Sequence, residues 1–396
     1  MPKNIVICCD GTGNEIEADS SNVLKLYRLL DKNPQQLVFY DPGIGTIGTQ
    51  NAWFRHTQKI RQLFSLATGA GLDKNVLDAY QFLVQHYRAN DKIYLFGFSR
   101  GAYTVRVLAG LIHLMGLLKP HQINLCSYAY KAYKQSSRYN DFKIGWGFRQ
   151  VTRAQNVPIK YLGVWDTVSS VLIPRPDLLV GIRQQTLPYT KTNPSIEVVR
   201  HALALDERRR MFRANHWSEP QAYKPNPFDD TQHDEQDIKQ VWFAGSHADI
   251  GGGYPEGRSA PAKSSLKWML REAEPHGLRF NQALFNHIVL GMPRKGSKRS
   301  YSAPDSTASL NDSMNWAWRL LEYLPKQARY RDWPDRKTLM KLYLPRCEPR
   351  KVPLNALIHH SVLERVERDI SYRPVNLSTE YQIVYDPDET PSIEKP

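Results

Sequence analysis

The chain has 396 residues, 41% of them hydrophobic, and a formal net charge of +14. This length and apolar content are those of a soluble globular protein with a large core, and they exclude membrane-spanning, fibrous and disordered chains. So positive a charge predicts attraction to anionic lipid headgroups, nucleic acid or an acidic partner, although a basic surface with no specific role fits equally well.

The first predicted element is a buried strand, "NIVICC", at residues 4–9. It is shorter than the apolar core of a signal peptide and runs straight into "DGTGN". No stretch of the chain reaches the roughly 20 apolar residues that a membrane span needs. The four cysteines do not make a disulfide scaffold, and the adjacent Cys8 and Cys9 should point to opposite faces of the strand. We therefore expect cytoplasmic synthesis and folding, without a signal peptide.

Strands and helices then alternate along residues 10–250. Asn22 is the predicted cap of a helix over residues 23–32, and "QLVFYDPG" is the next strand. A loop with several glycines (43–71) leads to an amphipathic helix at 72–90. Further strands are predicted at 92–99, 159–168 and 240–249, with a helix over 100–116. Such alternation indicates a mostly parallel sheet covered by helices on both faces.

Three regions depart from this alternation. Residues 117–157 and 168–195 are insertions, either lid segments beside the sheet or plain packing excursions. Residues 264–278 form a further predicted helix, and residues 281–396 are proline-rich and basic. We predict a catalytic domain over residues 1–280 and a basic, helical C-terminal extension over 281–396. The basic patches at 295–300, 326–337 and 345–351 are not continuous basic runs and show no aromatic-studded recognition pattern, so they do not favour nucleic acid.

The most informative stretch is Gly-Phe-Ser-Arg-Gly at residues 97–101, which joins a predicted strand directly to a predicted helix. A sharp strand-to-helix turn crowds the backbone, so positions two before and two after the serine must lack a side chain. Ser99 would then project at the amino end of the helix, where the dipole favours negative charge. The stretch predicts a nucleophile elbow, with the Arg100 backbone N–H as one oxyanion donor.

A nucleophilic serine needs a base, and the base needs an orienting acid. Asp166 directly follows the apolar "YLGVW", and His247 follows "VWFAG". The chain order Ser99, Asp166, His247 is the one expected of an α/β-hydrolase. Asp249 is the rival acid, although so close to His247 it would more readily bond the backbone of the glycine turn at 251–253. His201 lies in a predicted helix and is interpreted as structural.

The loop "CCDGTGN" at residues 8–14 is the expected source of the second oxyanion donor, from the N–H groups of Gly11, Thr12 or Gly13. Two alternatives fit less well. The motif of a haloacid-dehalogenase-type phosphatase matches at Asp10-Gly11-Thr12, but the position of its nucleophilic aspartate is occupied by Cys8. A dinucleotide fingerprint would need a third glycine that "GTGNEI" lacks.

Taken together, several motifs resemble those of a bacterial and fungal family that includes the phospholipase effectors called type VI lipase effector family one. The likeness spans roughly residues 3–280 and rests on "CCDGTGN", "GFSRGAYTVRVLAGLI", "YLGVWDTV", "HALALDERRRMF", "VWFAGSHADIGGGY" and "LKWMLREA". It implies an α/β-hydrolase fold, esterase or phospholipase A activity on glycerophospholipids and a triad of Ser99, Asp166 and His247. It also implies a secretion-system or immunity partner and export by a signal-independent route.

We therefore predict a serine hydrolase that cleaves carboxylic esters of lipids, with peripheral contact to an anionic membrane, and that needs no metal or cofactor. Two alternatives stay open. One is a catalytically silent hydrolase fold that binds an acidic partner or nucleic acid, because fold alone does not establish chemistry. The other is an esterase or peptide hydrolase for small substrates, whose lid segments exclude lipids.

Overall fold

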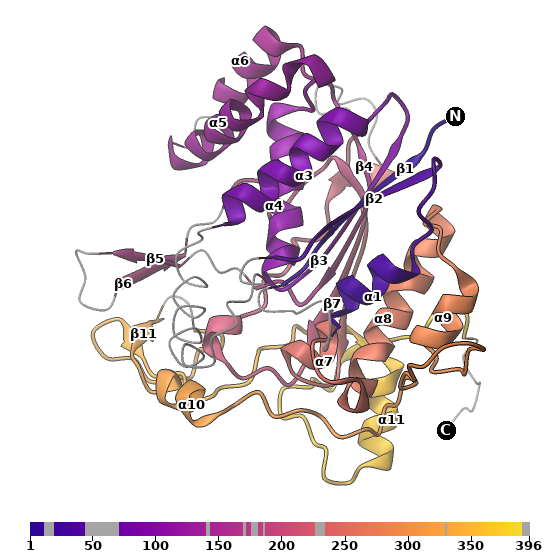
Figure 1. The fold of residues 1–396 in the computed structure, drawn as a ribbon. Coiled ribbons are helices and arrows are strands. Elements are labelled where there is room, and N and C mark those ends of the chain that lie inside the picture. Colours follow the sequence, from indigo (N-terminus) through magenta and orange to yellow (C-terminus); the bar gives the residue numbers. More distant parts are fainter. Residues whose placement is uncertain are drawn as a thin grey trace, which may run out of the picture.

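Eight strands form one sheet at the centre of the protein (Figure 1). The computed structural model describes residues 1–11, 20–43, 71–139, 143–168, 172–175, 181–184, 187–225, 234–328 and 331–389. The strand order is β14-β13-β10-β7-β4-β3-β1-β2, and every neighbouring pair is parallel. The strands are β1 (Asn4–Cys9), β2 (Gln36–Asp41), β3 (Lys92–Phe98), β4 (Ile159–Trp165), β7 (Ile196–Ala204), β10 (Asp237–Phe243), β13 (Ala356–His359) and β14 (Tyr381–Val384).

The central strands are continuous apolar runs because helices cover both faces of the sheet. Every residue of β1 is buried. Cys9 packs into the core on one face and Cys8 into the core on the other, as the alternation of side chains along a strand predicts.

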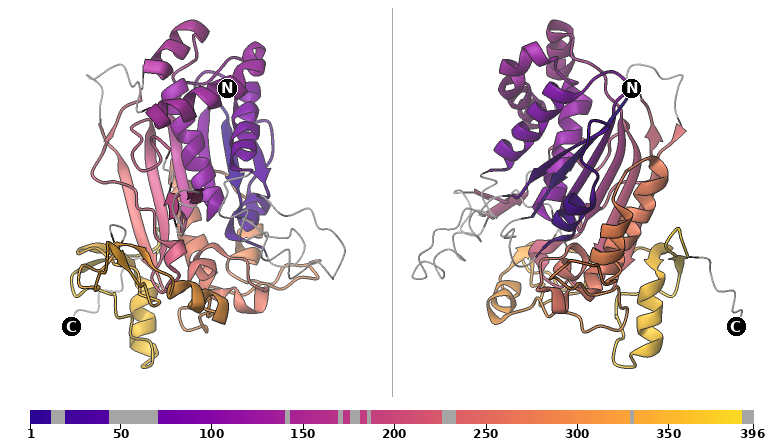
Figure 2. Two further views of the ribbon diagram at one scale, coloured as in Figure 1. Left: turned by 90° about the vertical axis from the view of Figure 1, so that its left-hand side faces the viewer. Right: turned by 45° about the vertical axis from the view of Figure 1, so that its right-hand side comes forward.

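The two helix layers lie on opposite sides of the sheet, as the views in Figure 2 show. One layer consists of α3 (Leu72–His86), α4 (Arg100–Met115), α5 (Cys126–Tyr139) and α6 (Lys143–Thr152). The other consists of α1 (Asn22–Leu29), α8 (Ala260–Ala273) and α9 (Gln282–Ile288). This is the predicted α/β-hydrolase-like architecture, a parallel sheet between two layers of helices.

The cap of the first helix differs from the prediction by one residue. Ser21 is the N-cap, and its hydroxyl accepts a hydrogen bond from the Leu24 N–H at 3.0 Å. Asn22 is the first residue of α1, and its buried amide donates to the carbonyl oxygens of Ile250 and Ala262 at 2.8 and 2.9 Å. Burial of this amide therefore ties α1 to the segment after β10 instead of capping the helix.

The two predicted insertions have different structures. Residues 117–157 include α5 and α6, whose apolar side chains pack against α3 and α4 in the same core cluster. Residues 168–195 contain β5 (Leu172–Arg175) and β6 (Gly181–Gln184), an antiparallel hairpin that projects from the body of the protein (Figure 1). Two other short pairs are β8 (Ala222–Tyr223) with β9 (Asp234–Glu235), and β11 (Lys326–Gln327) with β12 (Leu342–Tyr343).

The C-terminal region contains the expected helices and also completes the sheet. After α9 come α10 (Trp316–Glu322) and α11 (His360–Arg368), while β13 and β14 extend the sheet beyond β10. Figures 1 and 2 show this region at the end of the sheet where the strands finish. The sheet therefore draws on residues on both sides of the boundary predicted at position 280. No helix in the described ranges has both the length and the apolar run needed to cross a bilayer.

Candidate active site

Ser99 stands at the corner between β3 and α4, with no linker between strand and helix. Its backbone has φ 58° and ψ −117°, an unfavourable conformation for a residue with a side chain. A β-carbon on Gly97 would lie 2.5 Å from the Gly101 carbonyl oxygen, and one on Gly101 would overlap the Cys9 carbonyl. Both glycines are therefore required for the turn, which is the mechanical reason inferred from the sequence.

The strand register brings Asp166 to the same edge as Ser99. Phe98 of β3 pairs with Trp165 of β4, so the next residues along, Ser99 and Asp166, leave the sheet side by side. The Ser99 N–H donates to the Trp165 carbonyl at 3.2 Å. Asp166 is fully buried and has φ 35°, so this chain also turns sharply where the strand ends.

His247 is the first residue of the short helix α7 (His247–Gly251), four residues beyond β10. Its Nδ1 lies 2.5 Å from Asp166 Oδ2. Since a carboxylate can only accept, Nδ1 carries the proton and Nε2 is the nitrogen left for proton transfer. The ring packs against Phe98, with centroids 4.6 Å apart, and meets Phe212 edge-on at 4.9 Å. The imidazole is thus held beside the residue that precedes Ser99.

The glycine turn after His247 has a packing reason. A β-carbon on Gly251 would overlap the Phe98 ring, and one on Gly252, where φ is +79°, would lie 2.8 Å from the Asn22 backbone nitrogen. The turn therefore passes directly over the aromatic ring that supports His247, which only glycine permits.

Asp166 is also paired with Arg350 from the C-terminal region, which the sequence analysis did not predict. Arg350 is 4% exposed and donates from Nη1 to Oδ1 at 2.5 Å and from Nη2 to Oδ2 at 3.0 Å. The same guanidinium donates to the carbonyl oxygens of Ala204 (3.0 Å) and Phe212. The Ala204 N–H adds a further hydrogen bond to Asp166 Oδ1 at 3.1 Å.

These partners decide the charge of Asp166. Burial alone would raise the pKa of this carboxyl group, but the Arg350 charge and the hydrogen bond and charge of His247 lower it well below its usual range. Burial also lowers the pKa of a guanidinium, yet the Asp166 carboxylate raises the pKa of Arg350 overall. Asp166 is therefore an ionised carboxylate that contacts the His247 ring and is held in place by Arg350.

Asp249, the rival acid, is engaged elsewhere. Its Oδ2 accepts from the backbone N–H and the hydroxyl of Ser246 at 2.9 and 3.0 Å, which forms a capping box at the start of α7. Its Oδ1 accepts from the Asn311 amide at 2.6 Å. Burial raises the pKa of Asp249, and these hydrogen bonds oppose that effect. The carboxylate fixes the turn that presents His247 rather than contacting its ring.

A second carboxylate that the sequence analysis did not single out lies beside His247. Glu207 is 1% exposed and accepts from the His247 backbone N–H at 3.2 Å and from Arg209 Nη2 at 2.6 Å. Burial would raise its pKa, but the hydrogen bond and charge of Arg209 lower it. The guanidinium of Arg209 also lies 3.8 Å from the centre of the Phe212 ring. The motif "HALALDERRRMF" thus supplies the wall around the base, and its unusual density of charge was the available signal.

The predicted oxyanion donors are only partly described. The Arg100 N–H opens α4, at the helix terminus where orphan donors and the dipole favour an anion. The Gly11 N–H donates to the Asp10 carboxylate at 2.7 Å, so in this arrangement it is directed to its own neighbour. Thr12 and Gly13 lie outside the described residues.

His201 is structural, but the helix predicted around it is wrong. It lies in the middle of β7, between β4 and β10, where its ring contacts the Thr167 N–H (3.3 Å) and Arg106 (3.3 Å). Burial lowers the pKa of His201 well below the usual value, which fits a neutral core histidine. Within the described ranges, His359, His360 and Asp386 form the group of histidine and carboxylate side chains whose spacing could hold a metal ion. The residues around Ser99 are not part of it.

The chain is also similar to known proteins. The model of the family described as type VI secretion system phospholipase effector Tle1-like, catalytic domain, matches residues 3–272. A relative from Saccharomyces cerevisiae, "Uncharacterized protein YEL023C", is 32% identical over an alignment of 245 residues that covers 57% of this chain. The chain spans about a third (34%) of the length of that relative.

Two solved structures are also similar. One is an uncharacterized protein from Pseudomonas aeruginosa, with a TM-score of 0.36 and 16% identity over 71% of this chain and 46% of that one. The other is the Tle1 effector bound to the VgrG spike of the type 6 secretion system, with a TM-score of 0.31 and 18% identity over 65% of this chain and 52% of that one.

Proposed function

Because the chain belongs to the family of Tle1-like phospholipase effector catalytic domains, we propose that it is a serine hydrolase that cleaves carboxylic esters of membrane lipids. The catalytic residues that we assign are Ser99 as nucleophile, His247 as general base and acid, and Asp166 as the orienting acid. The observation that carries this assignment is the 2.5 Å contact between His247 Nδ1 and Asp166, at the sheet edge where Ser99 ends its strand.

In the proposed reaction, the Ser99 hydroxyl oxygen attacks the ester carbonyl while His247 Nε2 takes its proton. The carbonyl π electrons move to oxygen, and the Arg100 N–H is one donor to that oxyanion. Collapse of the intermediate breaks the ester C–O bond, and the imidazolium returns its proton to the leaving alcohol. Water then repeats the sequence on the acyl-serine and releases the fatty acid. Asp166, kept ionised by Arg350, stabilises the imidazolium in both halves.

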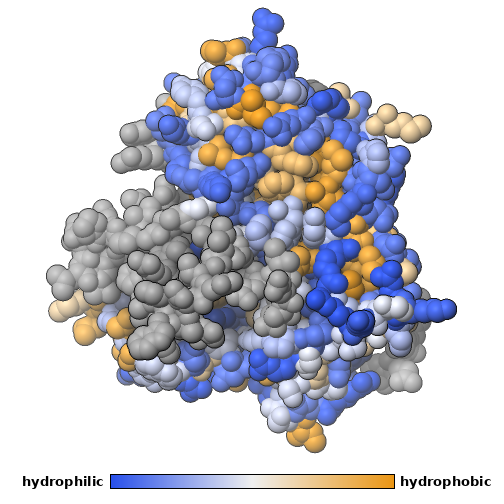
Figure 3. Space-filling view, viewed as in Figure 1, coloured by the Kyte–Doolittle hydropathy of each residue, from blue (hydrophilic) through white to orange (hydrophobic). Residues whose placement is uncertain are grey.

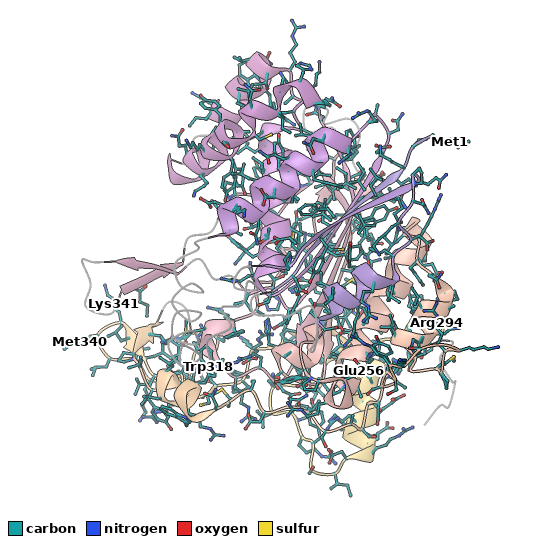
Figure 4. All side chains as sticks on the ribbon, viewed as in Figure 1. Met1, Glu256, Arg294, Trp318, Met340 and Lys341 are labelled. Atoms are coloured by element: carbon teal, nitrogen blue, oxygen red, sulfur yellow. The ribbon has the colours of Figure 1, made fainter. Side chains whose placement is uncertain are left out.

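A lipid substrate is supported by the surface next to the base. The Phe212 ring that touches His247 also meets Trp318 of α10, with centroids 5.4 Å apart. Trp316, at the start of α10, is 79% exposed, and Met340, between β11 and β12, is 88% exposed. Figure 4 places Met340 and Lys341 at the outer edge of the molecule, and Figure 3 shows hydrophobic colour at that edge, next to the grey atoms. Exposed apolar groups beside basic ones suit a lipid surface with anionic headgroups.

The vesicle assay compares hydrolysis of one phospholipid in anionic and in zwitterionic vesicles. We expect faster hydrolysis on anionic vesicles, with a difference that shrinks as salt rises, because each basic residue near the surface contributes about 1 kcal/mol within a Debye length of roughly 8–10 Å. Trp316→Ser should reduce the vesicle rate without changing hydrolysis of a soluble short-chain ester. Its matched control is Trp146→Ser, an exposed tryptophan (57%) on α6, at the opposite end of the molecule (Figure 1). Equal rates on both vesicle types at low salt would reject a role for the charge in lipid binding.

A substrate panel separates this proposal from its two alternatives. Phospholipids, triglycerides and short-chain esters are assayed with the wild-type protein and with Ser99→Ala. Activity confined to short-chain esters would identify a small-ester esterase, and no turnover of any ester would leave a silent binding protein. Residual activity of Ser99→Ala near the wild-type level would reject Ser99 as the nucleophile.

Family membership also leads us to propose a protein partner, either a component of a secretion system or an immunity protein, and export without a signal peptide. The test is co-purification of the full chain with candidate spike and immunity proteins encoded beside it. Failure of every candidate to bind the folded chain would reject this part of the proposal and leave the hydrolase assignment untouched.

A further inference from the structure

A second cluster of chemically reactive side chains lies at the carboxyl ends of β13 and β14. These strands are parallel neighbours, and His359 pairs with Val384 in the register. His359 ends β13 and His360 begins α11, while Asp386 comes two residues after Val384. Parallel strands finish at one edge of a sheet, so the two histidines and the aspartate converge there. The ligand atoms of these three residues all lie within 4.8 Å of one another.

The spacing of the donor atoms fits a small metal ion. His359 Nε2 and Asp386 Oδ1 are 3.5 Å apart. Two ligands that each lie 2.0–2.2 Å from a tetrahedral Zn²⁺ are separated by about 3.3–3.5 Å. His360 Nε2 lies 3.0 Å from Glu389 Oε2, so a second carboxylate is close enough to be a fourth ligand. The set of two imidazoles and carboxylates is the type that zinc prefers.

Two buried atoms of this cluster have no hydrogen-bond partner. His359 and Asp386 are 1% and 3% exposed, and neither His359 Nε2 nor Asp386 Oδ1 makes a hydrogen bond with any described residue. Buried polar atoms are normally satisfied, and leaving them unpaired costs about 1–3 kcal/mol each. These are also the two atoms that face each other across the 3.5 Å gap.

The rest of each side chain is already oriented. His359 Nδ1 is held by Ser361, whose hydroxyl lies 2.8 Å from it and whose backbone N–H donates to it at 3.4 Å. Nε2 is therefore the nitrogen that faces Asp386, and it binds a metal once it has given up its proton. Asp386 Oδ2 pairs with Lys267 at 3.0 Å, which leaves Oδ1 for the ion. The His359 ring stacks on Phe243 of β10, with centroids 4.4 Å apart. The ligands therefore have the outer contacts that hold metal ligands in place.

The local charge also favours a cation, in contrast to the chain as a whole. Lys267 is shared by three carboxylates, those of Asp386, Asp388 and Glu389, at 3.0, 3.8 and 2.5 Å. A fourth carboxylate, Glu364, lies 3.3 Å from His360 Nδ1. Arg271 also pairs with Asp388 at 2.9 Å, so these four carboxylates outnumber the two cations beside them, in a chain whose net charge is +14.

We propose that His359, His360 and Asp386, with Glu389 as the fourth ligand, form a zinc site that clamps β14 and the segment after it to α11 and the sheet. The site is structural and stands apart from Ser99, Asp166 and His247, so it does not depend on the hydrolase assignment. Its role is to anchor β14, an edge strand of only four residues, in addition to the ion pairs that Lys267 makes with the segment after it.

The experiment uses the full chain without a histidine tag, stripped with a chelator and dialysed. Titration with Zn²⁺ should show one tight site per chain, and Co²⁺ should give the intense visible absorption of tetrahedral cobalt. The stripped protein should gain thermal stability as zinc is added. His360→Gln and Asp386→Asn should each weaken zinc binding by about tenfold or more and abolish the cobalt band.

His121→Gln is the matched control. His121 is an exposed histidine in the segment just before α5, and this variant should bind zinc like the wild type. Asp386→Asn preserves shape, and thermal unfolding of each stripped variant establishes that it is folded. The proposal is overturned if the stripped wild type binds no zinc, if its cobalt complex lacks the tetrahedral band, or if folded His360→Gln binds as tightly as the wild type.

Discussion

Removal of Arg350 should lower the catalytic rate indirectly, through its effect on the Asp166 carboxylate. The guanidinium makes two buried hydrogen bonds to the Asp166 carboxylate, a buried one to the Ala204 carbonyl and a partly buried one to the Phe212 carbonyl. Breaking a buried ion pair by removing one partner typically costs about 3–5 kcal/mol of folding stability. Arg350→Met keeps much of the side-chain volume, so we expect a folded protein with a lowered melting temperature.

The catalytic consequence follows from the pKa of Asp166. Burial raises that pKa, and Arg350 is the first of the groups that outweigh burial. Without it, the pKa of Asp166 should rise, so that the carboxylate takes up a proton as the pH falls and no longer accepts from His247. We expect kcat/KM to fall by about 10²–10⁴-fold, the upper figure being the cost of losing the carboxylate of a triad.

The pH profile distinguishes this positioning role from general damage. In the wild type, Asp166 stays ionised throughout the assay range, since its pKa is far below it. In Arg350→Met, the acid limb of kcat/KM should move to higher pH, and Arg350→Lys should restore part of the loss because it returns the charge without the two parallel hydrogen bonds. Lys351→Ala, an exposed neighbour, should match the wild type. A folded Arg350→Met with an unchanged pH profile and near wild-type kcat/KM would refute the reasoning.

Three further predictions test other parts of the site and the fold. Asp166→Asn should lower kcat by about 10⁴-fold while Asp249→Asn costs far less, and steady-state kinetics showing the reverse order would move the triad acid to Asp249. Gly101→Ala should lose activity and about 1–3 kcal/mol of stability in denaturant unfolding because its β-carbon would overlap the Cys9 carbonyl. Gly147→Ala, inside α6 with nothing within 4 Å, should keep its activity and gain up to about 1 kcal/mol of stability. Burial lowers the pKa of Lys263 to about 7, so above that pH the unfolded chain binds a proton that the folded chain does not. Stability should therefore rise with pH by up to about 1.4 kcal/mol per unit relative to Lys263→Met, and parallel stability curves for the two proteins would contradict this.

The elbow could be predicted from sequence because its constraints are local. An apolar strand, a serine flanked by glycines and an amphipathic helix follow one another without a gap, and Gly97 is required by a contact within the turn itself. Gly101 is required by the backbone of the neighbouring strand β1. Asp166 and His247 could be placed because the first directly follows an apolar strand, the second comes four residues after another, and parallel strands finish at one edge. The distances between the side chains could not be predicted, since they depend on register.

Arg350 could not be found in the same way. It lies 184 residues from Asp166 in the sequence, within a stretch that reads as a basic surface patch. The sequence of this stretch does not distinguish an arginine that is buried from one that is exposed to solvent. Its role depends on the path of the C-terminal region across the sheet edge, for which no local pattern exists.

His201 and the last two strands show tertiary context overriding local preference. The alanine, leucine and arginine residues around His201 favour a helix, but this segment is buried on both faces between β4 and β10, so it is a strand. The strands β13 and β14 have four residues each and lie among prolines and charges. Runs so short carry too little periodicity to be separated from loops.

The most direct test of the account is covalent labelling of the intact, folded protein with a fluorophosphonate probe. The probe reacts only with a serine whose hydroxyl is activated, so one adduct on the peptide that contains Ser99 is expected for the wild type. Ser99→Ala should give no adduct, and His247→Ala should give very little. Absence of labelling in the folded wild type, or an adduct that persists in Ser99→Ala, would contradict the claim that this site is a serine nucleophile.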